Sequence, residues 1–78
     1  MGDAMIPISM IKEGDMFSNP LFVRMNPPGV IWRVEAINVK EEMVLVQAYS
    51  GSNMDAMKNS RVWKKNTDRM FSETWRYA

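Results

Sequence analysis

Turn-forming residues interrupt this chain so often that its apolar segments all stay short. The turn-type clusters are Lys12–Asp15, Ser18–Pro20, Asn26–Gly29, Lys40–Glu42 and Ser50–Asn53. Glycine and proline favour turns through their backbone geometry, and asparagine, aspartate and serine do so through short side chains that bond to the backbone. Short segments between such clusters are typical of β-strands, whereas helices need longer uninterrupted runs. The spacing therefore predicts a mainly β fold with at most one short helical turn.

The segments between the turns have strand-type composition. We expect strands at Met16–Phe17, Leu21–Met25, Val30–Val39, Met43–Tyr49 and Arg61–Lys65, with Glu73–Tyr77 as an optional closing strand. Strict alternation along Val30–Val39 places Val30, Trp32, Val34 and Ala36 on the predicted core face. Such a set of strands predicts a small, strongly bent antiparallel sheet or a five-stranded barrel.

Three local features of the turns and loops can be predicted from single residues. Gly14 suits a backbone with positive φ, because it has no Cβ to clash. Met54–Asn59 fits one helical turn, with Met54 and Met57 three residues apart. Thr67 is placed to cap a short helical turn with its hydroxyl.

The chain is long enough for one domain only. It has 78 residues, and a second independent core needs about 50 residues of its own. We therefore predict a lead-in arm or strand at 1–11 and a single small β-barrel domain at 12–78. Small domains gain stability from cross-links, metals or partner subunits. Because the chain has no cysteine, a homo-oligomer is one expectation.

The strand pattern carries a family resemblance. Gly14-Asp15-Met16-Phe17 leads into a hairpin segment, Val30-Ile31-Trp32-Arg33-Val34, and the chain closes with Phe71, Trp75 and Arg76. Over residues 10–77 this resembles the small SH3-like barrels found widely in bacteria and in phage or prophage genomes. The resemblance implies the barrel fold, and related barrels bind nucleic acid, peptides or other proteins, so it does not choose an activity.

The side chains that catalysis or metal binding would need are scarce. No histidine or cysteine is present, which excludes disulfides, Cys/His zinc sites and thiol or imidazole chemistry. Asp15 is expected to accept turn N–H bonds, and Glu41 and Glu42 point to opposite faces of a hairpin tip. Asn53 and Asp55 lack the glutamate that completes a calcium loop. We expect a non-enzyme with no metal and no cofactor.

Apolar runs and the N-terminus bear on localisation. The longest apolar run, Met43–Val46, is far shorter than the ~20 residues that span a bilayer. The segment Met1–Met10 carries Asp3 and lacks the basic flank of a signal peptide. We therefore expect a cytoplasmic protein that does not engage a membrane.

Charge and aromatic residues gather toward the C-terminus. Residues 1–57 have a formal charge of −3 and residues 58–78 of +4, an asymmetry that suggests an anionic partner. Nine methionines exceed what a small core uses, and exposed methionine beside tryptophan and arginine is typical of interface centres. The candidate partner-binding residues are Met54, Met57, Arg61, Trp63, Lys64, Lys65, Arg69, Trp75, Arg76 and Tyr77. Trp63 and Trp75 also suit a core, and the residues alone leave both assignments open.

The leading hypothesis is a non-catalytic protein-binding module, encoded by a phage or prophage, that modulates or inhibits a host protein. The alternative is a nucleic-acid-binding barrel that uses Lys64, Lys65, Arg69 and Arg76 on phosphates. A further alternative is an oligomer that binds a nucleotide or small anion through Arg33 or Arg61.

Overall fold

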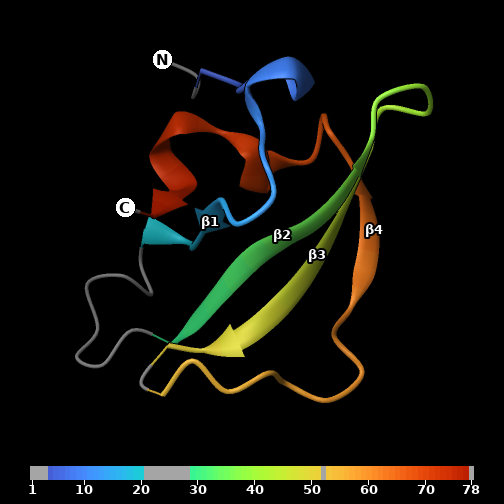
Figure 1. Ribbon diagram of the computed structural model, residues 1–78. Coiled ribbons are helices and arrows are strands. Elements are labelled where there is room, and N and C mark those ends of the chain that lie inside the picture. The colour runs from blue at the N-terminus through green and yellow to red at the C-terminus, as the bar shows by residue number, and fades with distance from the viewer. Residues whose placement is uncertain (1–3, 21–28, 52, 78) are drawn as a thin grey trace.

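A computed structural model describes residues 4–20, 29–51 and 53–77 and has a mainly β architecture (Figure 1). Its strands are β1 (Met16–Phe17), β2 (Val30–Asn38), β3 (Met43–Ser50), β4 (Val62–Lys65) and β5 (Arg76–Tyr77). They form one antiparallel sheet in the order β4-β3-β2-β1-β5. The predicted five-stranded antiparallel sheet is confirmed. Within the described ranges no pairing joins β4 to β5, so these strands are the two edges of an open sheet.

The long β2–β3 hairpin is the centre of the sheet (Figure 1). Its tip contains the predicted polar residues Lys40–Glu42 and also Val39, whose carbonyl accepts the Glu42 N–H at 3.2 Å. The Asn38 side chain accepts from the Glu41 N–H at 3.1 Å and ends β2 one residue earlier than expected. Polar residues thus close the hairpin where its valine-rich segments end.

A β-bulge in β2 overturns part of the predicted core face. The pairing with β3 shifts between Val34 and Ala36, and a bulge reverses which residues point to each face beyond it. Val34 is buried and Trp32 packs on the core, as expected, but Ile37 replaces Ala36 against the core. Ile31, predicted to point away from the core, is also buried. Strict alternation was therefore the wrong pattern for this strand.

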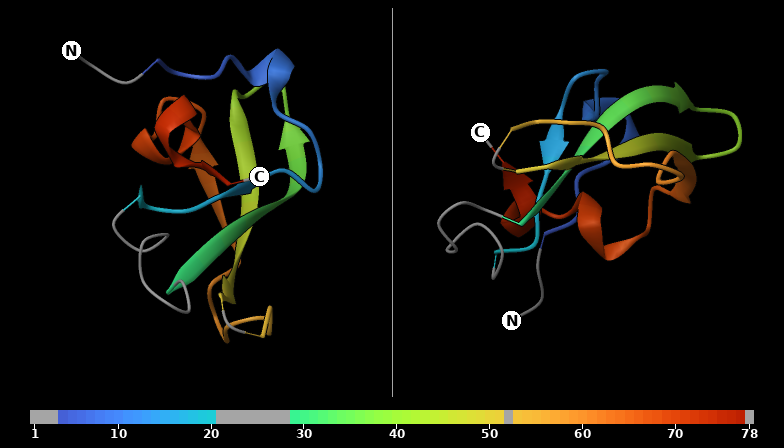
Figure 2. Two further views of the ribbon diagram at one scale, coloured as in Figure 1. Left: turned by 90° about the vertical axis from the view of Figure 1, so that its left-hand side faces the viewer. Right: turned by 90° about the horizontal axis from the view of Figure 1, so that it is seen from below.

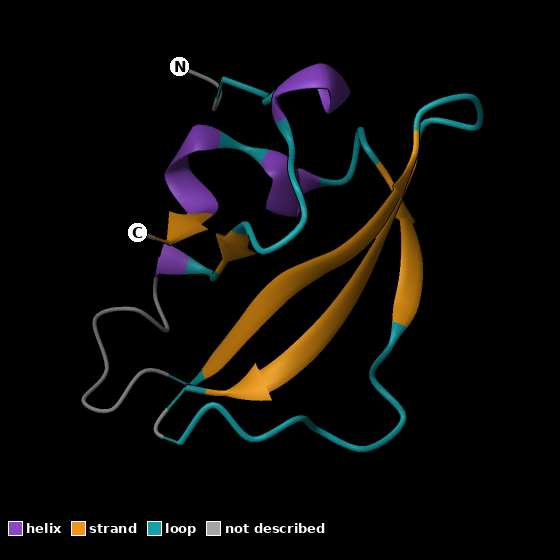
Figure 3. Ribbon diagram, in the orientation of Figure 1, coloured by secondary structure: helices purple, strands orange, loops and turns teal. Residues whose placement is uncertain are grey.

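Within the described residues there are three 3-10 helices, which lie on one side of the sheet (Figure 3), rather than the single helical turn expected. They are η1 (Ile8–Met10), η2 (Arg69–Phe71) and η3 (Glu73–Trp75). The cap of η2 is Asp68, whose carboxylate accepts the Met70 N–H at 3.0 Å, and not Thr67 as predicted. Asp68 directly precedes the helix, so its short side chain reaches the free N–H of the first turn.

The hydrophobic core joins both ends of the chain to the sheet. Its centre is an edge-to-face contact between Phe17 and Phe71, with ring centroids 5.3 Å apart. The cluster also contains Ile6 and Ile11 from the lead-in segment, Val34 from β2, Val44 and Val46 from β3, and Met70 from η2. The Ile6 N–H donates to the Phe71 carbonyl at 2.8 Å. Two residues of the lead-in segment are thus part of the core.

Figure 2 shows the same arrangement from the side and from below: the N-terminal segment and the C-terminal 3-10 helices lie close to one another, against the sheet. The predicted strand Leu21–Met25 and the turn residues 26–28 lie outside the described residues. None of the helices that the structure describes has the length and apolar character needed to cross a bilayer.

Candidate functional site

The structure separates the candidate binding residues into two groups. Residues 54–65 lie along the β3–β4 edge of the sheet, whereas Trp75, Arg76 and Tyr77 lie at the β5 edge. Arg69 is exposed on η2, between the two groups in the chain. A basic and aromatic segment that is continuous in sequence therefore does not form one continuous site.

Residues 54–57 run beside the end of β3 rather than forming the predicted helical turn. The Met57 N–H donates to the Ala48 carbonyl at 2.9 Å, and the Ser50 N–H donates to the Asp55 carbonyl at 2.8 Å. Ala56 forms an isolated bridge with Tyr49. These bonds make the segment a short extension of the β4 edge.

The side chain of Gln47 fills the break between this extension and β4. Its amide nitrogen Nε2 lies 2.6 Å from Ser60 Oγ and 3.0 Å from the Met57 carbonyl. Ser60 Oγ in turn donates to the Met57 carbonyl at 2.6 Å. Sequence reasoning missed Gln47 and Ser60, although a lone glutamine within the valine-rich β3 segment was a signal that could have indicated them.

Large apolar side chains are exposed along this edge. Their exposed fractions are 41% for Met54, 42% for Met57, 40% for Val62 and 44% for Trp63. Trp63 is paired with Leu45 of β3, and Val62 with Val46. Trp63, left open between core and surface by the sequence, is therefore a half-exposed edge residue.

Cations accompany these apolar groups. Lys64 approaches Asp68, with 3.9 Å between Nζ and Oδ2. Arg61 and Lys65 are exposed, and no ion pair involves either of them in the part of the chain that the structure describes. We call Met54, Met57, Arg61, Val62, Trp63 and Lys65 the edge surface. It combines apolar contact area with two cations that form no ion pair within the described residues, although Lys65 lines a pocket together with Glu41 and Glu42.

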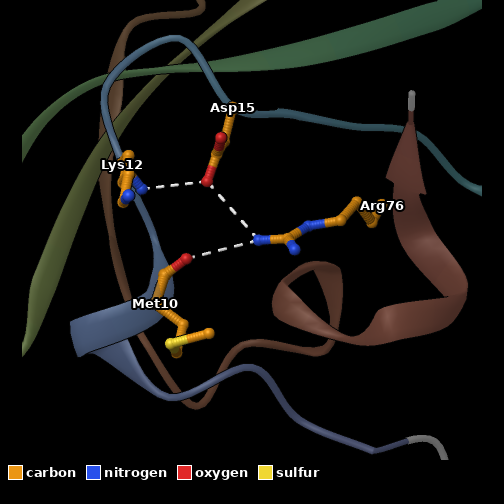
Figure 4. Close-up of polar contacts among 4 residues, drawn as sticks. All are labelled: Met10, Lys12, Asp15 and Arg76. Carbon is orange, nitrogen blue, oxygen red and sulfur yellow. Dashed lines mark hydrogen bonds and ion pairs between the residues drawn. The ribbon is translucent and has the colours of Figure 1, made fainter.

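At the other edge, Arg76 holds the two chain ends together (Figure 4). Its Nη2 atom lies 3.5 Å from Asp15 Oδ2 and 3.3 Å from the Met10 carbonyl. Asp15 Oδ2 also accepts the Lys12 N–H at 2.9 Å, which confirms its predicted turn role. We call Asp15, Arg76, the Met10 carbonyl and the Lys12 N–H the clasp. Arg76, predicted to bind a partner, is engaged in this structural contact.

The neighbours of Arg76 have similar structural roles. Trp75 packs against the core cluster, and Tyr77 pairs with Met16 of β1. A pocket of about 350 Å³ beside the clasp is lined by Gly14, Asp15, Met16, Arg76 and Tyr77. Its carboxylate is already held by the clasp, and among the described residues no group of three or more Asp, Glu, His or Cys could hold a metal ion.

Comparisons with protein-family models, curated protein sequences and solved structures gave no match for this chain.

Proposed function

We propose that this protein is a non-catalytic protein-binding module that contacts its partner through the edge surface. The observation that carries the proposal is the run of half-exposed apolar side chains, Met54, Met57, Val62 and Trp63, along one sheet edge. Val62 and Trp63 are consecutive in β4 and project to opposite faces of the sheet, so the exposed groups border this edge on both sides. Exposed apolar groups rimmed by polar ones are typical of interaction sites. Tryptophan, methionine and arginine are also enriched where protein interfaces are buried.

The backbone of Met54 places its side chain at the end of this edge. Its φ is +55°, and the left-handed region costs about 1–2 kcal/mol for a residue with a Cβ. The Met54 N–H donates to the Ser50 carbonyl at 2.7 Å, so the positive φ closes the turn that follows β3. This turn leaves the Met54 side chain 41% exposed beside the edge.

The finer part of the proposal concerns the source and role of the module. We propose a small SH3-like barrel from a phage or prophage that modulates or inhibits a host protein. This part rests on the resemblance carried by Gly14–Phe17 and the hairpin segment that follows it.

Nucleic acid binding is the alternative that one observation favours. Exposed Arg61 and Lys65 flank half-exposed Trp63, and single-stranded nucleic acids bind to cations interleaved with stacking rings. That function predicts an affinity that falls steeply with salt, because each contacted phosphate releases counterions.

Affinity capture from nuclease-treated bacterial extracts tests the proposal. The baits are the wild-type chain, Trp63→Ala and, as a matched control, Val39→Ala, which removes a 63% exposed residue from the hairpin tip. We expect a protein that wild type and Val39→Ala recover equally and Trp63→Ala loses. Equal recovery by Trp63→Ala would contradict the proposal. Loss of every partner on nuclease treatment would favour nucleic acid binding.

A further inference from the structure

The backbone of β4 suggests what kind of segment the edge surface binds. The Asn66 N–H donates to the Glu42 carbonyl at 3.0 Å, and Lys64 and Val62 follow it in the same register opposite Val44 and Val46. Residues of an antiparallel strand alternate between bonding to their neighbour and pointing away from it. Val62 and Lys64 therefore bond to β3, and the backbone groups of Trp63 and Lys65 point outward.

Three of these outward groups have no hydrogen-bond partner among the described residues 4–20, 29–51 and 53–77. The Lys65 carbonyl accepts the Asp68 N–H at 2.9 Å, which leaves the Lys65 N–H and both backbone groups of Trp63. β4 is the last strand of the described sheet on this side. An open strand edge of this kind is a template for pairing with another extended chain.

We propose that the edge surface binds an extended acidic segment of a partner protein, which adds to β4 as a further antiparallel strand. This inference rests on the proposed function and specifies its partner. A peptide strand supplies both the donor and the acceptor that Trp63 needs. A phosphodiester backbone offers acceptors only, so it would leave the Trp63 carbonyl without a donor.

Charge argues against a second copy of this chain at β4. Antiparallel self-pairing centred on Trp63 would place Arg61 opposite Lys65, and like charges directly opposite are destabilising. An acidic strand has the reverse effect, because Lys65 then faces a carboxylate. Lys64, which already lies 3.9 Å from Asp68 Oδ2, contributes less. The edge is therefore self-repelling and complementary to an anionic partner.

The register also predicts the order of residues in the partner. Opposite Lys65, Lys64, Trp63 and Val62, an antiparallel strand read from its N-terminus would present acid, acid, aromatic and apolar side chains. Aromatic cross-strand pairs and opposite-charge pairs are the favourable ones in antiparallel sheets. A blocked synthetic peptide, Thr-Glu-Glu-Phe-Val-Thr, is the probe that follows.

The test is a titration of the full chain with this peptide, followed by amide NMR. We expect the largest shifts at the Trp63 and Lys65 amides. N-methylation of the peptide's Phe removes the donor to the Trp63 carbonyl, and we expect affinity to fall about tenfold. N-methylation of the next residue, Val, is the matched control and should have little effect, because that amide faces away from β4.

A pair of protein variants tests the same bond from the other side. Lys65→Ala removes the charge alone and should weaken binding about threefold. Lys65→Pro also removes the outward N–H, a substitution that an edge strand tolerates, and should weaken binding about tenfold further. The peptide variants give an independent answer if Lys65→Pro does not fold.

Three results would overturn strand addition. The first is no binding of the parent peptide, and the second is an equal loss of affinity for the two N-methylated peptides. The third is displacement of the peptide by a single-stranded oligonucleotide that shifts the same Trp63 and Lys65 amides. The proposed function has a separate outcome. If protein capture still depends on Trp63 while N-methylation has no effect, the edge surface binds protein by its side chains alone. If neither dependence is seen, both proposals fail.

Discussion

Two halves of the C-terminal segment, residues 61–65 and residues 70–77, are both rich in aromatic and basic residues but differ in their surroundings. In residues 61–65, Trp63 is half exposed and Arg61 and Lys65 face solvent. In residues 70–77, Phe71 is fully buried, Trp75 packs on the core and Arg76 belongs to the clasp. The difference lies in their neighbours. Both β4 and β5 are edge strands, but residues 70–77 also pack against the N-terminal segment and the core. Aromatic and basic residues therefore have structural roles in one half and are available for contact in the other.

The largest expected effect is a loss in the free energy of unfolding when a core residue of the second half, residues 70–77, is truncated. Phe71→Ala removes one ring of the Phe17–Phe71 pair and should destabilise the fold by about 3–5 kcal/mol, as large-to-small core substitutions do. A domain of this size is stable by only about 5–10 kcal/mol, so much of that margin would be lost. Denaturant unfolding measures the change.

Trp63→Ala is the matched substitution in the other half. It removes an even larger aromatic group from β4, yet should destabilise the fold by clearly less than Phe71→Ala, because the Trp63 side chain is 44% exposed and its loss leaves no enclosed cavity. Equal losses of stability for Phe71→Ala and Trp63→Ala would remove the distinction between the halves.

The next largest effect concerns the turn at Gly14, which precedes the Asp15 that Arg76 contacts. Gly14 has a φ of +91° with open space around its missing Cβ. Gly14→Val should therefore destabilise by about 1–3 kcal/mol through backbone strain alone. Gly14→Asn, whose side chain tolerates positive φ better, is the control in thermal unfolding, and a cost equal to that of valine would argue against a strain mechanism.

The clasp itself should contribute less. Asp15 and Arg76 are partly exposed, and exposed ion pairs contribute about 0.2–1 kcal/mol. A double-mutant cycle with Asp15→Ala and Arg76→Ala should give a coupling energy in that range, and salt should reduce it. A coupling near zero at low salt would show that Arg76 is not held, and would return it to the candidate binding residues.

The smallest effect is expected at the edge surface, where a substitution should raise the stability of the fold rather than lower it. Met54→Gly relieves the strain of a positive φ and should raise stability by up to about 1 kcal/mol, while weakening partner capture. Asn59, with a φ of +58°, is the control, because asparagine already tolerates this region and Asn59→Gly should gain less. A loss of stability in Met54→Gly would mean that the side chain serves the fold.

Local features of this fold followed from the sequence. The positive φ of Gly14, the turn role of Asp15 and the polar hairpin tip all depend on residues close together in the chain. Backbone geometry and short-range hydrogen bonds set these features, so single residues are sufficient to predict them.

Features set by distant contacts did not follow from the sequence. The bulge after Val34 depends on the pairing of β2 with β3, and the burial of Ile6 depends on Phe71, far along the chain. For the candidate site, the other residues of the edge surface were among the predicted ones, but exposed Val62 was not. The separation of this surface from Trp75, Arg76 and Tyr77 was also not predicted. Tertiary pairing decides that separation, and composition does not encode it.

Amide hydrogen exchange of the isolated protein tests the central claim, that β4 is an open edge, most directly. The account predicts slow exchange at Val62 and Lys64, whose N–H groups bond to β3, and exchange near that of an unstructured peptide at Trp63 and Lys65. Strong protection of the Trp63 and Lys65 amides would mean that this edge is already covered, and would contradict the account.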